Sequence, residues 1–583
     1  MRKTLATALG AIALTIATTS VMAQQNQKTI SLRIVETSDV HGYFFPYDFV
    51  ESQPLKGTLA RVSTYVKRLR SQYGDRLLLL DNGDILQGQP TCYWSNYVVG
   101  DAEENIAAQV VNYMGYDAET FGNHDVETGH AVYDKWIREV RCPMLGANII
   151  DTRTGRPYVK PYHIFVRDGV KIAVLGMLTP TIPCWLNESL WKGLAFSEMV
   201  TTARQWVKHI REVEHADLVV GLFHSGLSGG ITMDGGIEED ASERVAREVP
   251  GFDIVFFGHD HMQHNQWVAN TAGSQVLLLD PSCWALNVAD AQIELTYKDG
   301  RLTGKQIKGD IVSIRDEKID DQMVAHFQPQ IERIKAYVGR KIGRFENTTR
   351  TRDSYFGNSA FTDFVHNLQL QISKADISFN APLSFDSEIR AGEVTVADMF
   401  KLYRFENQLY ILKMTGREVR GHLEESYDRW VNTMKSADDH LLLLNDESRG
   451  DQQRMGFRNY TFNFDSAAGI DYEVDVTKPD GQKVRILRMS DGQPFDENKT
   501  YSVVMNSYRG NGGGELLTKG AGIPKDQIGE RIIYQSPLDL RHYLMEEIER
   551  MGTARPAPNH NWKFVPEEWT VPAAERDRKL VFG

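Results

Sequence analysis

Five short strand-like stretches of this sequence each lead into acidic, amide or imidazole side chains, and this repeated pattern constrains the fold most strongly. The clearest is 77–80, four leucines followed by Asp-Asn-Gly-Asp, which ends at Asp84. An unbroken apolar run of this length is typical of a strand buried on both faces in a helix-covered sheet. Open α/β sheets bind ligands at the carboxyl ends of their strands. One such turn alone would be a solvated strand end; five of them indicate a site.

The other four stretches lie at 30–35, 117–121, 218–223 and 252–257, and they lead into Asp39 and His41, into Asn123, into His224, and into His259 and His261, respectively. Helical spacing of apolar residues separates them, at 58–73, 105–114 and 199–213. Alternation of this kind predicts an α/β fold with helices packed on both faces of a sheet.

Seven of these side chains are oxygen or nitrogen donors: Asp39, His41, Asp84, Asn123, His224, His259 and His261. The set suits two divalent metal ions that share one carboxylate. The histidines favour zinc or another first-row ion, and the aspartate and asparagine oxygens make the site suitable for manganese as well. Two ions about 3.5–4 Å apart clamp a phosphoryl group and activate water for in-line attack. A lone histidine would more simply be a packed core residue. Packing alone does not predict donors after five strands.

The first 23 residues have the pattern of a secretory signal peptide. Arg2 and Lys3 precede an apolar stretch at 5–21, and small residues lead to a cleavage position after Ala23. We therefore expect an exported protein, located in the periplasm or otherwise outside the cytoplasm. No later stretch is apolar for long enough to span a bilayer, so we expect no stable membrane insertion.

Removal of Arg2 and Lys3 changes the formal net charge from −13 to −15. So acidic a protein is a poor binder of nucleic acid polymers, because their phosphates repel it. A small anionic substrate would need local positive charge, such as a metal ion. The four cysteines, Cys92, Cys142, Cys184 and Cys283, match no zinc spacing. Disulfides and buried free thiols both stay open, and the oligomeric state is not predicted.

At 583 residues the chain is too long for a single core. We expect a catalytic domain over 28–330, a polar interdomain linker over 331–350, and a second α/β (α+β) domain over 351–583. Residues 552–572, which contain proline and tryptophan, are expected to form an extended tail on the surface.

The strand-end motifs resemble those of the calcineurin-like metallophosphoesterases. They read Asp-Val-His at 39–41, Gly-Asp at 83–84, Gly-Asn-His-Asp at 122–125, a single histidine at 224 and Gly-His-Asp-His at 258–261. More narrowly, the chain is similar to the exported 5′-nucleotidase family, which includes 2′,3′-cyclic-nucleotide phosphodiesterases. The resemblance implies an N-terminal domain of β-sheet layers flanked by helices, and a nucleoside-binding C-terminal domain. It implies that Asp39, His41 and His261 hold one metal, that Asn123, His224 and His259 hold the other, and that Asp84 bridges them.

The resemblance also implies a catalytic role for His124 outside the metal shell, either stabilising phosphoryl charge or protonating the leaving oxygen. In much of the family an aspartate three positions later orients this histidine. Here that position is Glu127, while Asp125 follows the histidine directly. Either carboxylate is a candidate for the catalytic pair, and either could instead serve as charge at a helix N-terminus.

In the second half, the family motifs place two aromatic rings around the nucleobase. One is Phe405 in Phe-Glu-Asn, which ends at Asn407, and the other is Tyr508 before a glycine turn that includes Gly512 and Gly513. Stacking tolerates any base and contributes about 1–3 kcal/mol per base. Without the resemblance, both rings would more simply be core residues.

One departure from the 5′-nucleotidase pattern concerns the phosphate side of the substrate. The typical Asn-Gly-Gly followed by Ile-Arg is replaced by Asn380-Ala-Pro, an inserted stretch at 383–388, and then Arg390. Arg390 is a candidate for a phosphate or ribose contact. Residues 381–382, Tyr403 and the Phe-Asp pair at 464–465 look more like the cyclic phosphodiesterase and 3′-nucleotidase branch.

We therefore expect an exported dimetal phosphohydrolase that acts on nucleoside phosphate esters, with a small nucleotide as its partner. The leading alternative is a 2′,3′-cyclic-nucleotide 2′-phosphodiesterase/3′-nucleotidase. A nucleotide-binding surface protein with an inactive centre and a hydrolase of non-nucleotide phosphoesters are the remaining alternatives.

Overall fold

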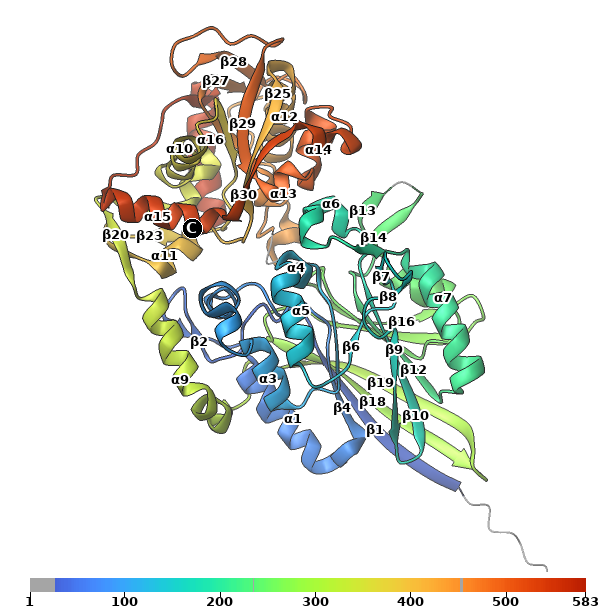
Figure 1. Ribbon diagram of the computed structural model, residues 1–583. Helices are drawn as coiled ribbons and strands as arrows, with labels where there is room; N and C mark the ends of the chain where they lie inside the picture. Colours follow the sequence, from blue (N-terminus) through green and yellow to red (C-terminus); the bar gives the residue numbers. More distant parts are fainter. Residues whose placement is uncertain (1–26, 234, 451–453) are drawn as a thin grey trace, which may run out of the picture.

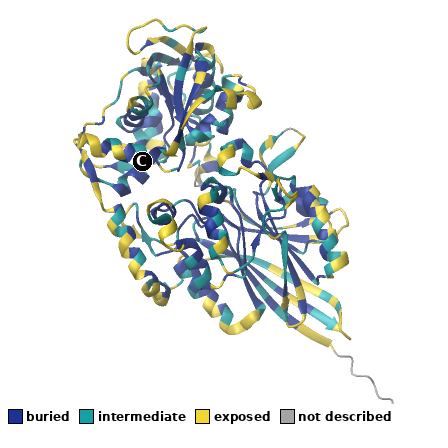
Figure 2. Ribbon diagram, in the orientation of Figure 1, coloured by how far each residue is buried: buried dark blue, intermediate teal, exposed yellow. Residues whose placement is uncertain are grey.

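The computed structural model of the protein describes residues 27–233, 235–450 and 454–583, and the predicted signal peptide, residues 1–23, lies outside them. Figure 1 shows two domains, with the C-terminal half (yellow to red) above one end of the N-terminal half (blue to green). Strands form the interior of each domain, and Figure 2 shows exposed residues on helices, on loops and at the far ends of the strands at the bottom of the N-terminal domain.

The N-terminal domain is built on two stacked six-stranded sheets. The first has the order β19 (Arg301–Ser313), β18 (Asn287–Lys298), β1 (Gln27–Thr37), β4 (Leu77–Asp81), β5 (Ala118–Thr120) and β6 (Met144–Leu145). The second has the order β16 (Gln263–Ala269), β17 (Gln275–Pro281), β15 (Ile254–Phe257), β12 (Leu218–His224), β10 (Val170–Leu178) and β9 (Tyr162–Arg167). Their inner faces share one apolar core, in which Ile34 and Leu80 of the first sheet meet Val220 and Phe256 of the second.

Helices cover the outer face of each sheet. On the first sheet, α1 (Leu59–Tyr73), α3 (Ile106–Met114), α5 (His130–Glu139) and α9 (Asp321–Val338) pack against residues such as Val35 and Leu79. On the second, α7 (Met199–His209) and α8 (Ser242–Glu248) pack against Val219 and Val255. The predicted α/β class, with sheet layers flanked by helices, is confirmed. The leucines at 77–80 are fully buried because alternate side chains point into two different cores.

The C-terminal domain is also mixed α/β. Its main sheet has the order β26 (Ser466–Ala468), β22 (Ile377–Asn380), β29 (Thr500–Asn506), β25 (Gln408–Thr415) and β30 (Ile532–Asp539). One face packs on α10 (Ala360–Ser373), α11 (Val396–Leu402) and α15 (Leu540–Met551), and the other on α12 (Gly416–Trp430). A small sheet of β28 (Val484–Met489), β27 (Ile470–Asp475) and β32 (Trp562–Val565) completes the domain.

A helix and a strand occupy the stretch 331–350, where a polar linker was expected. Helix α9 continues to Val338 and buries Ile334 in the N-terminal core, since its apolar residues keep their three-to-four spacing past 331. Strand β20 (Lys341–Phe345) then pairs with β24 (Gly392–Thr395) of the C-terminal domain. In the structure, the connection between the two domains is therefore shorter than predicted and consists of the residues between Val338 and Lys341.

The expected surface tail at 552–572 is instead part of the fold. Strand β32 lies in this range and pairs with β27, and it buries Trp562 and Phe564 in the C-terminal core. Helix α16 (Glu567–Phe582) begins in the same range. The four cysteines are free thiols. Within the described residues, no helix combines the length and apolarity that crossing a bilayer requires.

Candidate metal centre and substrate pocket

The donor residues meet because parallel strands of both sheets end at the same edge of the sandwich. Strands β1, β4 and β5 run parallel in one sheet, and β12 and β15 run parallel in the other. Hydrogen bonds tie the following loops together: His41 N donates to Asp84 O (2.8 Å), and His259 N donates to Asp39 Oδ2 (3.0 Å). The side chain of Asn82 donates to Phe223 O (2.9 Å) and so joins the two sheets.

Five of the seven predicted donors have left-handed backbone conformations. The φ angles of Asp39, His41, Asp84, His259 and His261 are 51°, 49°, 56°, 86° and 60°. Positive φ is uncommon outside glycine, and such strained residues cluster at functional sites, where the surrounding structure holds them. These loops therefore adopt an unfavourable backbone conformation, and in that conformation they place the side chains of the donor residues at the site.

Two glycines let these loops approach closely. A Cβ atom on Gly122 would lie 2.0 Å from Oδ1 of Asp84, and one on Gly258 would lie 1.9 Å from Oγ of Ser38. No side chain fits at either distance, so glycine is required at both positions.

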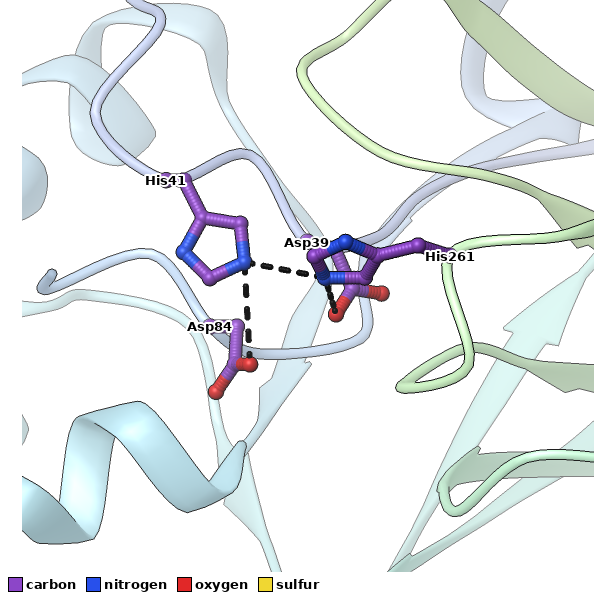
Figure 3. A group of neighbouring side chains, drawn as sticks. All are labelled: Asp39, His41, Asp84 and His261. Atoms are coloured by element: carbon purple, nitrogen blue, oxygen red, sulfur yellow. Dashed lines mark hydrogen bonds and ion pairs between the residues drawn. The ribbon is translucent and has the colours of Figure 1, made fainter. Parts of the chain in front are cut away.

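The first cluster consists of Asp39, His41, Asp84 and His261, with donor atoms all within 4.8 Å of one another (Figure 3). His41 Nε2 lies 3.1 Å from His261 Nε2, and His261 Nε2 lies 3.2 Å from Asp39 Oδ1. His41 Nδ1 contacts the carbonyl oxygen of Gln87 at 3.0 Å. Because a carbonyl only accepts, Nδ1 carries the proton and Nε2 presents a lone pair to the cluster.

The second cluster forms around His224, which is completely buried. Its Nδ1 donates to Asn82 O at 2.7 Å, so Nε2 is the ring nitrogen that faces the cluster, and Asp84 and Asp39 raise the pKa of His224 to about 9 against the effect of burial. That Nε2 lies 3.1 Å from Asn123 Oδ1 and 3.3 Å from Asp84 Oδ2. One imidazole nitrogen and two oxygens thus lie close together, and these are the atom types with which zinc and manganese are bound in proteins. The residues therefore fit a divalent metal ion.

Asp84 stands between the two clusters. Its Oδ1 accepts a hydrogen bond from His124 N at 2.8 Å, while its Oδ2 lies 3.8 Å from His41 Nε2 and 3.3 Å from His224 Nε2. Burial favours the neutral acid, but His224, His124 and His41 hold the pKa of Asp84 well below its usual range. One charged oxygen thus faces both donor sets.

His259 lies beside the second cluster, with its ring 5.2 Å from that of His224. Its Nε2, however, contacts Glu239 Oε1 at 3.0 Å and lies 3.9 Å from Asp240 Oδ1, both in β14 (Ile237–Asp240). Glu239 was not among the predicted site residues. The acidic run at 238–240, shortly after the loop of His224, was the available signal.

His124 and both candidate carboxylates lie on the short helix α4 (Asn123–Glu127). Glu127 Oε2 contacts His124 Nδ1 at 2.6 Å. Asp125 instead accepts four backbone hydrogen bonds, from the N–H groups of Asp84, Ile85, Leu86 and Gly122. Burial lowers the pKa of His124, but Asp84 and Glu127 outweigh burial and raise it to about 9.

A cavity of about 1230 Å³ lies between the domains, with donor residues of both clusters, among them His41, Asp84 and Asn123, on one wall. Phe405, Asn407 and Tyr508 line the opposite wall, as do Tyr460 and Phe462, which were not predicted. The aromatic spacing Tyr-Thr-Phe-Asn-Phe at 460–464 was the available signal.

The other predicted substrate contacts do not line this cavity. Gly512 and Gly513 lie next to its lining residues Gly514 and Glu515. The side chain of Arg390 is 86% exposed and pairs with Glu388, and it is not among the lining residues.

Comparison with known proteins relates each of the two domains to a family. The calcineurin-like phosphoesterase family matches residues 32–263, and the 5′-nucleotidase C-terminal domain matches residues 341–519. The 2′,3′-cyclic-nucleotide 2′-phosphodiesterase/3′-nucleotidase of Haemophilus influenzae is 26% identical over 606 residues, covering 93% of this chain and 88% of its own. The 5′-nucleotidase of Vibrio cholerae is 26% identical over 450 residues, covering 70% of this chain and 77% of its own.

Solved structures share the two-domain fold. A Staphylococcus aureus protein solved in complex with α-ketoglutarate has a TM-score of 0.75 at 22% identity, covering 92% of this chain and all of that one. The 5′-nucleotidase precursor of Thermus thermophilus has a TM-score of 0.63 at 19% identity, again covering 92% and 100%. This chain therefore combines a calcineurin-like phosphoesterase domain, residues 32–263, with a 5′-nucleotidase C-terminal domain, residues 341–519.

Proposed function

We propose that this protein is an exported dimetal phosphohydrolase that hydrolyses phosphate esters of nucleotides. One observation carries the proposal: Asp84 Oδ2 faces two donor clusters on the wall of a cavity whose opposite wall presents Phe405 and Tyr508. A phosphate and a nucleobase on one small molecule match these two walls. The match of residues 32–263 to the calcineurin-like phosphoesterase family supports the same class of reaction.

In this proposal Asp39, His41 and His261 hold one divalent ion, and Asn123, His224 and His259 hold the other, with Asp84 shared. Zinc, manganese or a similar ion fits these donors. When bound, two such ions supply charge that polarises the phosphoryl group and activates water.

The protein's own contribution to the chemistry centres on His124. Its ring lies 5.4 Å from that of His41, at the edge of the first cluster, and its side chain is 26% exposed toward the cavity. Glu127 holds Nδ1, which leaves Nε2 to donate a proton to the leaving oxygen or a hydrogen bond to a phosphoryl oxygen. Asp125 is assigned a structural role, because its carboxylate is fully used by the backbone.

The aromatic wall would hold the nucleobase. We propose that Phe405 and Tyr508 stack on it, an interaction that tolerates any base. Phe462 packs edge-on against Tyr508 at 6.0 Å and limits the freedom of that ring.

Among nucleotides, 2′,3′-cyclic and 3′-phosphates are the favoured candidates over 5′-phosphates. Relatives from Haemophilus influenzae and Salmonella typhimurium, each 26% identical, carry the name 2′,3′-cyclic-nucleotide 2′-phosphodiesterase/3′-nucleotidase. In addition, Arg390, which is a phosphate-side candidate by the 5′-nucleotidase pattern, is solvent-exposed and paired with Glu388. The 5′-nucleotidase reaction is the second candidate, supported by the match to its C-terminal domain.

The test is a substrate panel on the purified mature protein, with 5′-AMP, 3′-AMP and 2′,3′-cyclic AMP in zinc, manganese, cobalt or magnesium. Release of phosphate from 3′-AMP and opening of the cyclic ester, both faster than 5′-AMP hydrolysis, would support the favoured candidate. Preference for 5′-AMP would select the second. Tight binding of all three without turnover in any metal would instead indicate a nucleotide-binding protein. Turnover of non-nucleotide phosphoesters alone would contradict the assigned substrate class.

Export is tested separately by sequencing the N-terminus of the protein recovered from its native host. The proposed cleavage predicts a mature chain that begins at Gln24, whereas a chain that retains Met1 in the cytoplasm would contradict export.

A further inference from the structure

One hydrogen bond joins the C-terminal domain directly to the group that holds His124. Asn407 Nδ2 donates to Glu127 Oε1 at 3.4 Å, across the domain interface. The other oxygen of the same carboxylate, Oε2, contacts His124 Nδ1 at 2.6 Å. Glu127 is thus shared between a residue of each domain, and its two oxygens have different partners.

The orientation of the Asn407 amide is fixed from within the C-terminal domain. Tyr403 Oη donates to Asn407 Oδ1 at 3.5 Å, and Tyr403 is completely buried. Because the amide oxygen is used in this way, the NH₂ group is the one that faces Glu127. The main chain is held as well, since Leu540 N donates to Asn407 O at 2.7 Å. Asn407 itself is only 6% exposed.

The same segment of the C-terminal domain docks on the N-terminal domain. Tyr93, at the end of α2 (Pro90–Tyr93), donates through its hydroxyl to Asp539 Oδ2 at 3.0 Å. The buried guanidinium of Arg541 lies 5.0 Å from the centre of the Tyr93 ring and 4.0 Å from that of Phe400. Arg541 Nε also donates to Tyr403 O at 3.0 Å. Docking of Tyr93 and the position of Asn407 therefore depend on the same few residues.

The length of the side chain at position 127 makes this connection sterically possible. Glutamate has one methylene more than the aspartate found here in much of the family. With that extra reach, one carboxylate contacts both His124 and Asn407. The side chain of Glu127 is only 10% exposed, so water has little access to replace either contact.

We infer that Asn407 is a positioning residue for the hydrolytic step: it orients Glu127, and through Glu127 the ring of His124, only while the C-terminal domain is docked. This role is separate from any contact that Asn407 makes with a nucleobase. It makes the orientation of His124, the proposed proton donor to the leaving oxygen, depend on docking of the C-terminal domain, which binds the nucleoside. The inference rests on the function proposed above for His124.

The test uses a substrate that has no nucleobase but keeps a poor alkyl leaving group, namely whichever of ribose 3-phosphate and ribose 5-phosphate the wild type hydrolyses. Asn407→Ala is expected to lower kcat on this substrate by about three- to tenfold, the effect of one hydrogen bond to a carboxylate, with KM little changed. If Asn407 only contacts the base, kcat on the base-free substrate will stay within twofold of wild type, and the inference is overturned.

A double-mutant cycle with Glu127→Asp separates coupling from general damage. Aspartate keeps the reach to His124 but loses the reach to Asn407, so Glu127→Asp alone should lower kcat by the same factor as Asn407→Ala. Adding Asn407→Ala to Glu127→Asp should then cause no further loss. Additive losses would contradict the inference. If Asn407→Ala fails to fold, as judged by melting temperature and metal content, Asn407→Ser and the single variant Glu127→Asp supply the same comparison.

The matched control is Asn187→Ala. Asn187 Nδ2 donates to Tyr410 Oη at 2.6 Å across the same domain interface, and it has no contact with Glu127 or His124. This control should leave base-free turnover unchanged, whereas an equal loss in both variants would assign the effect to weakened docking alone. His124→Ala separates the proposed function from this inference. If His124→Ala is as active as wild type, the proposed role of His124 is refuted. If His124→Ala loses activity and Asn407→Ala does not, only the role of Asn407 is refuted.

Discussion

Oε2 of Glu127 lies 2.6 Å from Nδ1 of His124, and this contact decides which of two neighbouring carboxylates serves the histidine. Asp125 is closer in sequence, but its two oxygens accept hydrogen bonds from four backbone N–H groups. The two carboxylates on α4 therefore have different functions, and mutation should separate them.

Glu127→Ala should lower kcat on nucleotide substrates by about 10- to 100-fold, because a general acid or charge-stabilising group that is free to rotate loses part of its contribution. Metal content and melting temperature should stay at the wild-type values, since Glu127 is outside both donor clusters. Steady-state kinetics with parallel metal analysis checks this. Loss of metal from Glu127→Ala would mean that the carboxylate belongs to the metal site after all.

Asp125→Asn should instead destabilise the fold. An amide NH₂ group would face two of the backbone N–H groups that the carboxylate now accepts, with a penalty of about 2–5 kcal/mol in the free energy of unfolding. The loop that carries Asp84 should loosen, so metal affinity should fall as well. Urea denaturation measures the first effect and metal titration the second. Asp101→Asn, at an exposed position, is the control, and equal stability of the two variants would refute the structural role of Asp125.

Phe405→Ala and Tyr508→Ala should each raise KM for nucleotides by about 5- to 100-fold, the equivalent of about 1–3 kcal/mol of lost stacking. Neither should change KM for a ribose phosphate. Parallel kinetics on the two substrate types is the measurement. A similar rise in KM for the base-free substrate would show that these rings shape the cavity rather than bind the base.

Glu406 makes stability depend on pH. Its two carboxylate oxygens are buried and accept no hydrogen bond from a described residue, and burial raises its pKa to about 8, although Arg541 opposes the shift. Between pH 4.5 and 8 the folded chain retains a proton that the unfolded chain has lost, so this group makes the free energy of unfolding fall as the pH rises.

Glu406→Gln cannot ionise and should remove that trend. Relative to wild type, its melting temperature should increase between pH 5 and pH 8.5, whereas the exposed control Glu568→Gln should show no such change. A melting-temperature difference between Glu406→Gln and wild type that is the same at both pH values would show that Glu406 stays ionised in the folded protein.

The sequence was enough to predict the α/β class and the positions of polar side chains at the ends of strands, because both depend on local patterns. Apolar runs such as 77–80 mark strands buried on two faces, and parallel strands bring their carboxyl ends together. The division of the strands into two sheets could not be predicted, because the residues of a stretch such as 218–223 do not indicate which sheet that strand joins. The spacing of apolar residues was enough to predict that α9 continues to Val338. The predicted linker was too long because it was based on the polar residues at 347–351.

Contacts between distant segments could not be predicted. Asn407 and Glu127 are 280 residues apart, and only the docking of two folded domains brings them together. Glu239, which contacts His259, lies on a separate hairpin. Arg390 is exposed to solvent and pairs with Glu388. Each depends on tertiary placement rather than on spacing along the chain.

The central claim is that Asp84 is shared by two divalent ions, and metal analysis of the purified chain tests it most directly. Wild-type protein reconstituted with zinc or manganese and desalted should hold two equivalents of metal by mass spectrometry. Asp84→Asn should retain one or fewer and lose at least about 1000-fold in kcat, because the shared charge supports both ions. A wild type that hydrolyses nucleotides with no bound metal, or an Asp84→Asn variant that keeps two ions and full activity, would contradict the account.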